Sequence, residues 1–124
     1  MPRTATTLLL AAVVALLALG AGAASAGTKT VKIGDNWFVR SDASSTPTVT
    51  VTKNSTVKWT WVGDSEHDIR ASSVPSGEKK SRFRASARST GSFQRKMTVV
   101  GTYRLYCSIH DYEPQKMVLK VRAK

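Results

Sequence analysis

Residues 101–110 read Gly-Thr-Tyr-Arg-Leu-Tyr-Cys-Ser-Ile-His, and this stretch decides the fold that we expect. Tyr103, Leu105 and Cys107 alternate with more polar side chains, which is the period of a half-buried β-strand. The cysteine therefore continues the apolar face and lies where the strand meets the next loop. His110 follows three residues later, so both side chains can reach one metal ion.

The rest of the chain from Lys29 onward has the same short-strand pattern and no helical period. In one expected strand Val57, Trp59 and Trp61 share a face. Residues 71–92 are irregular and rich in Ser, Arg and Lys, and we expect a long loop there with room for a helical turn. Short strands separated by turn residues predict an all-β, two-sheet sandwich. The expected strands are 31–33, 37–39, 48–52, 56–61, 67–70, 93–99, 102–107 and 116–123.

The first 26 residues have the layout of a secretory signal peptide. Arg3 precedes an apolar run over residues 8–19, and Ala24-Ser25-Ala26 offers a cleavage site. The run is shorter than the roughly 20 residues that span a bilayer, although an uncleaved N-terminal anchor is the alternative. We therefore expect cleavage after Ala26 and one mature domain over residues 27–124. This domain would have no transmembrane span and would lie outside the cytoplasm, in the periplasm or at the cell exterior.

The chain is strongly basic, with 19 Lys and Arg against 8 Asp and Glu, and the net charge of +11 falls to +10 without Arg3. A cluster of basic side chains either docks an acidic redox partner or belongs to a solvated loop that keeps the protein soluble. Nucleic-acid binding is disfavoured, because the chain is expected to be exported and no exposed aromatic residues are expected among these charges. The basic cluster consists of Lys79, Lys80, Arg82, Arg84 and Arg88.

The metal-binding side chains form a small set. Cys107 is the only cysteine, so no internal disulfide can form, and the only histidines are His67 and His110. A thioether, Met117, follows shortly. Two imidazoles, a thiolate and a weak axial ligand are the donors of an electron-transfer copper site, although zinc accepts the same donors. The sequence therefore predicts one copper ion.

Three segments together carry a family resemblance. Val-Lys-Trp59-x-Trp61, followed by His67-Asp68-Ile69 and then by residues 101–110, resembles the plastocyanin-like members of the cupredoxin family of blue-copper proteins. The resemblance implies a Greek-key β-sandwich with copper at one end. It also implies that His67, Cys107 and His110 are the equatorial ligands, and that Asp68 ties the two ligand-bearing loops together.

The axial ligand has two candidates. Met117 lies seven residues after His110, and Gln115 lies five after it, a spacing that many plastocyanin-like proteins use for methionine. Some relatives use a glutamine oxygen instead. The two residues are two apart in a strand and face the same side, so the strand register decides between them. Met117 is favoured because its sulfur is the softer donor, with Gln115 as the alternative.

These features predict a monomeric one-electron carrier and not an enzyme, because no catalytic triad, paired carboxylates or phosphate loop is visible. A second hypothesis is a copper-buffering or copper-delivery protein without redox turnover. A third is a metal-free interaction module that is linked to another chain through Cys107.

Overall fold

The computed structural model describes residues 26–110 and 115–124. The expected signal peptide lies outside these residues, apart from its last residue, Ala26. Within the described ranges, no helix has the length and apolar character needed to cross a membrane.

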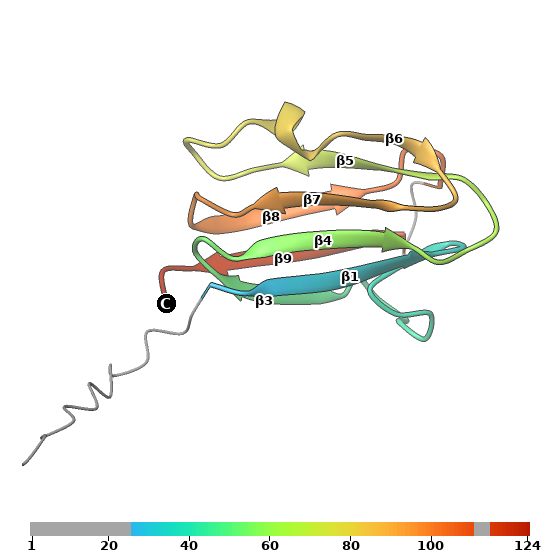
Figure 1. Cartoon of the computed structure of the whole chain (residues 1–124), viewed down its shortest axis with the longest axis horizontal. Coiled ribbons are helices and arrows are strands. Elements are labelled where there is room, and N and C mark those ends of the chain that lie inside the picture. Colours follow the sequence, from blue (N-terminus) through green and yellow to red (C-terminus); the bar gives the residue numbers. More distant parts are fainter. Residues whose placement is uncertain (1–25, 111–114) are drawn as a thin grey trace, which may run out of the picture.

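In the part of the chain that the structure describes, nine strands form two mixed sheets that face one another (Figure 1). One sheet has the order β2-β1-β4-β7, and the other has the order β3-β9-β8-β5-β6. The pairs β1/β4 and β3/β9 are parallel, and the remaining pairs are antiparallel. The strands are β1 (Thr28–Gly34), β2 (Trp37–Phe38), β3 (Thr48–Thr52), β4 (Thr56–Trp61), β5 (His67–Ser73), β6 (Ala85–Arg88), β7 (Ser92–Lys96), β8 (Gly101–Tyr106) and β9 (Lys116–Arg122).

Alternating side chains build the core between the sheets, which confirms the predicted β-sandwich. Val57, Trp59 and Trp61 of β4 are buried from one sheet, and Tyr103 and Leu105 of β8 are buried from the other. The side chains between them along each strand face outward, as a period of two requires. Cys107 continues the buried face of β8 beyond the end of the strand, as predicted.

The expected long loop over residues 71–92 is wrong in part. Strand β5 continues to Ser73, and a 3₁₀ helix, η1 (Lys80–Phe83), is followed by the edge strand β6. Phe83 is fully buried and its ring lies 5.1 Å from that of Tyr103, while Ala85 is also buried. These two apolar contacts order the segment, but two apolar residues are too few to produce a periodic pattern in the sequence.

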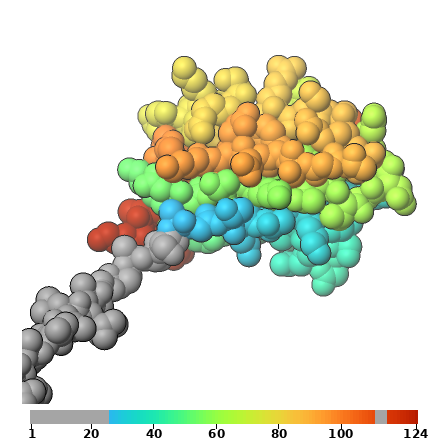
Figure 2. Space-filling view, in the orientation of Figure 1, coloured from blue at the N-terminus to red at the C-terminus, as the bar shows by residue number. Residues whose placement is uncertain are grey.

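Strand β7 is also shorter than expected and ends at Lys96. Met97 turns inward to the core, where its amide donates to the Ser55 carbonyl at 2.8 Å. Across the face shown in Figure 2, β1, β4 and β7 form adjacent bands in blue, green and orange.

The strands bring two distant parts of the sequence to one end of the sandwich. Strand β4 runs toward this end and β5 starts there, while β8 runs toward it and β9 starts there (Figure 1). We call this end the metal pole, defined by His67, Cys107 and His110. The start of β1 and the described C-terminus lie at the opposite end.

Candidate metal centre

The three predicted donors come from two segments that are 40 residues apart in the chain. His67 is the first residue of β5, and Cys107 follows the last residue of β8. The strands β5 and β8 pair directly, with Arg70 opposite Tyr106. This antiparallel pairing places the start of one strand beside the end of the other, so His67 lies next to Cys107.

The donor atoms of His67, Cys107 and His110 lie within 4.8 Å of one another. The Nδ1 atom of His67 is 4.0 Å from the Cys107 sulfur, and the two imidazole centroids are 5.1 Å apart with their planes inclined by 48°. His67 and Cys107 are fully buried, whereas His110 is only partly buried. Bonds from such donors to a metal ion are about 2.0 to 2.3 Å long, so two donors of one ion lie at most twice that length apart. The observed separation of the donor atoms is close to this limit.

Asp68 joins the two donor-bearing segments, at the place where the resemblance predicts a linking residue. Its Oδ1 accepts the Ser108 amide at 2.7 Å, and its Oδ2 accepts the Ser108 hydroxyl and Arg70 Nε, the latter at 3.1 Å. Burial raises the pKa of Asp68, but the hydrogen bonds from Ser108 and Arg70 outweigh burial and hold it below its usual value. Asp68 is therefore an anion that fixes the Cys107 loop against the start of β5.

The start of β5 is held from the other sheet by Trp61. The indole Nε1 donates to the His67 carbonyl oxygen at 2.7 Å. The Arg88 guanidinium lies 5.0 Å from the centroid of the indole ring, within the range of a cation–π contact. The backbone of His67 is thus fixed from both sheets, so its ring enters the site with little freedom to move.

One of three comparisons with known proteins finds similar proteins, among solved structures. No protein-family model and no curated protein matches the sequence. Among solved structures, oxidised plastocyanin from Dryopteris crassirhizoma is 26% identical with a TM-score of 0.60, and the match covers 76% of this chain and 100% of that protein. A purple cupredoxin from Nitrosopumilus maritimus is 18% identical with a TM-score of 0.58, covering 74% and 97% respectively. A Cu(I) form of an amicyanin mutant is 20% identical with a TM-score of 0.61, covering 77% and 83%.

The chain has the cupredoxin fold. The predicted fold class is therefore confirmed, and so is the resemblance to the plastocyanin-like cupredoxins. Its donor set of two imidazole nitrogens and one cysteine sulfur fits copper, because thiolate favours Cu(I) and imidazole accommodates both oxidation states. The burial of His67 and Cys107 keeps water from two of the three donors.

Within this cupredoxin fold, the register separates the two axial candidates. The Cys107 amide donates to the Gln115 carbonyl at 3.1 Å, so Gln115 lies beside Cys107. Met117 lies opposite Leu105, one inward-facing pair farther from the metal pole, and its sulfur accepts the Trp59 indole N–H at 3.4 Å. Gln115 is fully buried, and neither its Oε1 nor its Nε2 has a hydrogen-bond partner among the described residues. The sequence favoured Met117 as the axial ligand, whereas these contacts favour Gln115 for that position.

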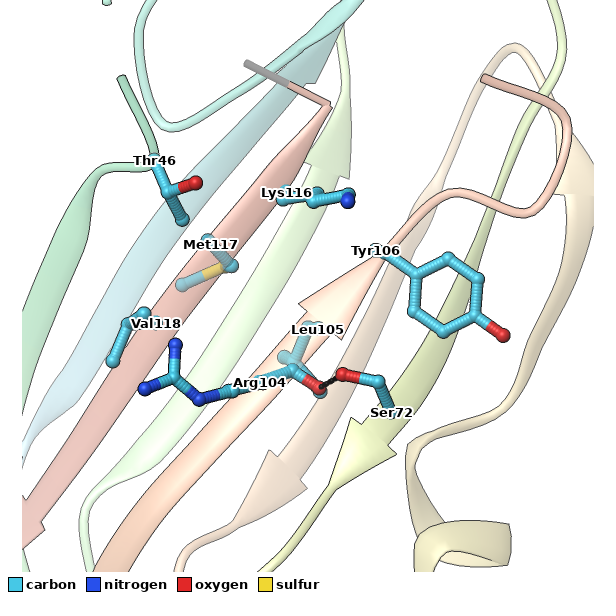
Figure 3. Close-up of a pocket in the computed structure, with 8 residues that line it drawn as sticks. All are labelled: Thr46, Ser72, Arg104, Leu105, Tyr106, Lys116, Met117 and Val118. Carbon is cyan, nitrogen blue, oxygen red and sulfur yellow. Dashed lines mark hydrogen bonds between the residues drawn. The ribbon is translucent and has the colours of Figure 1, made fainter. Parts of the chain in front are cut away.

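One surface hollow of the sandwich is separate from the metal centre. It has a volume of about 460 Å³ and lies over β5, β8 and β9, where Arg104, Tyr106 and Lys116 line it (Figure 3). The Ser72 hydroxyl at its edge donates to the Arg104 carbonyl at 3.3 Å. None of His67, Cys107 and His110 is among its lining residues, so this hollow is not part of the metal site.

Sequence reasoning missed Asp35, which contacts His67 directly. Its Oδ1 lies 3.0 Å from His67 Nε2. Asp35 precedes His67 by 32 residues and lies in the turn between β1 and β2, so nothing in the sequence connects it with the donor set. Trp61 was expected in the core, and its hydrogen bond to His67 was also not foreseen. No local sequence signal could have identified either contact, because both depend on how distant segments pack.

Proposed function

We propose that this chain is an exported type 1 copper protein that carries one electron. The observation that supports the proposal is the convergence of His67, Cys107 and His110, whose donor atoms lie within 4.8 Å of one another at one end of a cupredoxin sandwich. In the proposal these three side chains are the equatorial ligands. Bound copper supplies the chemistry, since it alternates between Cu(I) and Cu(II).

The residues of the chain hold the site in one geometry for both oxidation states. The β5–β8 pairing, Asp68 and Trp61 fix the segments that carry the donors. Rigid donors reduce the rearrangement that accompanies gain or loss of an electron. His110 is the donor residue nearest solvent, and Ile109 beside it is 50% exposed. We infer that electrons enter and leave at this edge.

Gln115 is our proposed axial ligand. Its buried amide has no hydrogen-bond partner among residues 26–110 and 115–124, and an unsatisfied buried group is unfavourable by about 1 to 3 kcal/mol, which calls for a compensating role. The backbone of Gln115 is hydrogen-bonded to that of Cys107, and in our proposal its amide oxygen supplies the weak axial donor that such copper sites use. In this assignment Met117 is a core residue that accepts the hydrogen bond of Trp59.

We also propose that the chain is cleaved after Ala26, that residues 27–124 act outside the cytoplasm as a monomer, and that an acidic redox protein is the partner. The basic cluster supports this partner only in part. Arg82 is bound to Glu78 at 2.8 Å, and Arg88 lies against Trp61. Lys79, Lys80 and Arg84 are exposed and offer the free positive charge of the cluster.

A copper titration of the protein, followed by visible spectroscopy, tests the proposed function. We expect one Cu(II) per chain, an intense thiolate-to-Cu(II) charge-transfer band, and complete bleaching by one electron equivalent. Cys107→Ser should bind copper without the band while keeping its β-type circular dichroism. Copper binding without the band in the unaltered protein would instead indicate copper buffering or delivery.

A failure to bind copper would support the metal-free module. The structure disfavours one form of that module, because Cys107 is fully buried and its thiol cannot reach a second chain without local opening.

A further inference from the structure

The imidazole of His67 bridges a carboxylate and the cysteine sulfur. Its Nδ1 faces Cys107 Sγ at 4.0 Å, and its Nε2 lies 3.0 Å from Asp35 Oδ1. The ring is fully buried, whereas the Asp35 side chain is 38% exposed. The carboxylate thus lies behind the ring, on the side away from the proposed copper ligands.

The Asp35 carboxylate is held in place by the loop before β5. The Asp64 amide donates to both carboxylate oxygens at 3.0 and 3.1 Å, and the Ser65 amide donates to Oδ1 at 2.9 Å. Gly63 lets the loop approach, because a Cβ at this position would lie 2.3 Å from Asp35 Oδ1. An aspartate carboxylate is ionised at neutral pH, and the backbone amides of Asp64 and Ser65 hold this one in place. The group is therefore a fixed anion at neutral pH.

Two consequences follow from a fixed anion at Nε2. A carboxylate can only accept hydrogen bonds, so the ring proton resides on Nε2 and the lone pair of Nδ1 points toward Cys107. Carboxylates that accept from the outer nitrogen of a ligating histidine orient the ring and raise its basicity. A negative charge near the site also favours Cu(II) over Cu(I), because the oxidised ion carries the greater positive charge.

We propose that Asp35 is a positioning residue of the copper site, which holds His67 in the Nε2–H tautomer and lowers the reduction potential of the copper. The second part of this inference rests on the proposed function. The first part does not, because the tautomer is a property of the protein without metal.

The tautomer is measured on the metal-free protein by long-range ¹H–¹⁵N NMR of the His67 ring. We expect Nε2 to be protonated and Nδ1 to be unprotonated in the unaltered chain, and we expect Asp35→Ala to lose this preference. A ring that is protonated on Nδ1 in the unaltered protein would overturn the inference, and so would an unchanged tautomer in Asp35→Ala.

The potential is measured on the copper-loaded protein with Asp35→Asn, which keeps the size of the side chain and removes its charge. We expect a shift toward the reduced form of at least tenfold in the redox equilibrium, about 59 mV for one electron. The matched control is Asp64→Asn. This exposed carboxylate lies in the same loop, and its contact with Asp35 is through the backbone amide, which the substitution keeps.

The outcomes separate the two ideas. Equal shifts of the reduction potential in Asp35→Asn and Asp64→Asn would mean that any negative charge at the metal pole has this effect, and would overturn the specific role of Asp35. An unchanged potential in Asp35→Asn would overturn it as well. A protein that has the expected tautomer but develops no copper band would contradict the proposed function and leave the positioning of His67 by Asp35 intact.

Discussion

At the scale of single residues, Gln115 is the side chain that most needs an explanation. Both polar atoms of its amide are buried and lack hydrogen-bond partners among the described residues. Proteins usually satisfy such groups, so an exception points to a role in binding or chemistry. Met117, by contrast, has a partner in Trp59 and neighbours typical of the core.

We therefore expect Gln115→Leu to raise the reduction potential of the copper-loaded protein by at least about 59 mV, a tenfold change in the redox equilibrium. Loss of an oxygen donor destabilises Cu(II) more than Cu(I). Met117→Leu is the matched control, because it keeps the volume and should change stability by less than about 1.5 kcal/mol and leave the visible spectrum in place. Voltammetry and visible spectra check both. A larger shift in the Met117 variant would return the axial role to the methionine.

At the scale of elements, Glu78 holds the segment between β5 and β6 against the sandwich. Its side chain is 2% exposed and accepts from Arg82 at 2.8 Å and from the Lys79 amide at 2.9 Å, and the Tyr103 hydroxyl lies 3.2 Å away. Tyr103 belongs to β8 and also donates to the Val99 carbonyl at 2.6 Å. One carboxylate thus links the segment containing η1 to the central strand of a sheet.

This link predicts a loss of stability in acid. Burial raises the pKa of Glu78, but the Lys79 amide and Arg82 hold it below the ordinary value of 4.5. Because the folded-state pKa is depressed, the stabilisation is complete above about pH 4.5 and is lost as the pH falls through the folded-state value. Glu78→Gln should lose about 1.5 to 3 kcal/mol at neutral pH and show a weaker acid dependence. Urea unfolding at several pH values measures both.

The control for this prediction is Glu66→Gln, which alters an exposed glutamate at the metal pole. We expect its free energy of unfolding at neutral pH to stay within about 0.5 kcal/mol of the unaltered protein. If the two variants respond equally to acid, Glu78 has no special part in the acid dependence.

At the scale of the whole molecule, acidic side chains gather in the loops of the metal pole, where the basic residues Arg88 and Lys116 also lie. Asp35, Asp64 and Glu66 lie in the loops of the metal pole, in a chain whose net charge is +11. The basic residues Lys53, Lys96 and Arg122 lie at the other end. The Lys53 amide donates to the Arg122 carbonyl there, and Lys96 lies opposite Thr56 at the start of β4. The six residues of β4 span about 20 Å between these ends, roughly two Debye lengths at 0.1 M salt.

The charge near the metal should therefore govern electron exchange more than the net charge of the molecule. With the anionic oxidant ferricyanide at 0.1 M salt, we expect the double change Asp64→Asn and Glu66→Gln to raise the rate constant about twofold to threefold, since the local field becomes more positive. Lys53→Gln with Lys96→Gln should change it by less. Stopped-flow mixing measures the rates, and a larger effect from the distant pair would contradict the argument.

Three properties could be predicted from the amino-acid sequence alone: the strands with a clear period of two, the all-β class and the three donor types. These properties are local: Trp59 and Cys107 are assigned to a buried face by their immediate neighbours, and the donor chemistry of His67 and His110 is intrinsic to the side chains. The family resemblance, to which Cys107-Ser-Ile-His110 contributes, also predicted how the strands are arranged in two sheets.

The side chains that surround the donors could be identified only from the packed fold. Gln115 lies beside Cys107, and Met117 lies beside Leu105, because of the β8–β9 register. Asp35 reaches His67 because the turn after β1 packs against the loop before β5. A shift of one residue in a register, or a different turn, would change these contacts without altering any local pattern in the sequence. Contacts between segments distant in the chain depend on the packing of the two sheets, which no local stretch encodes.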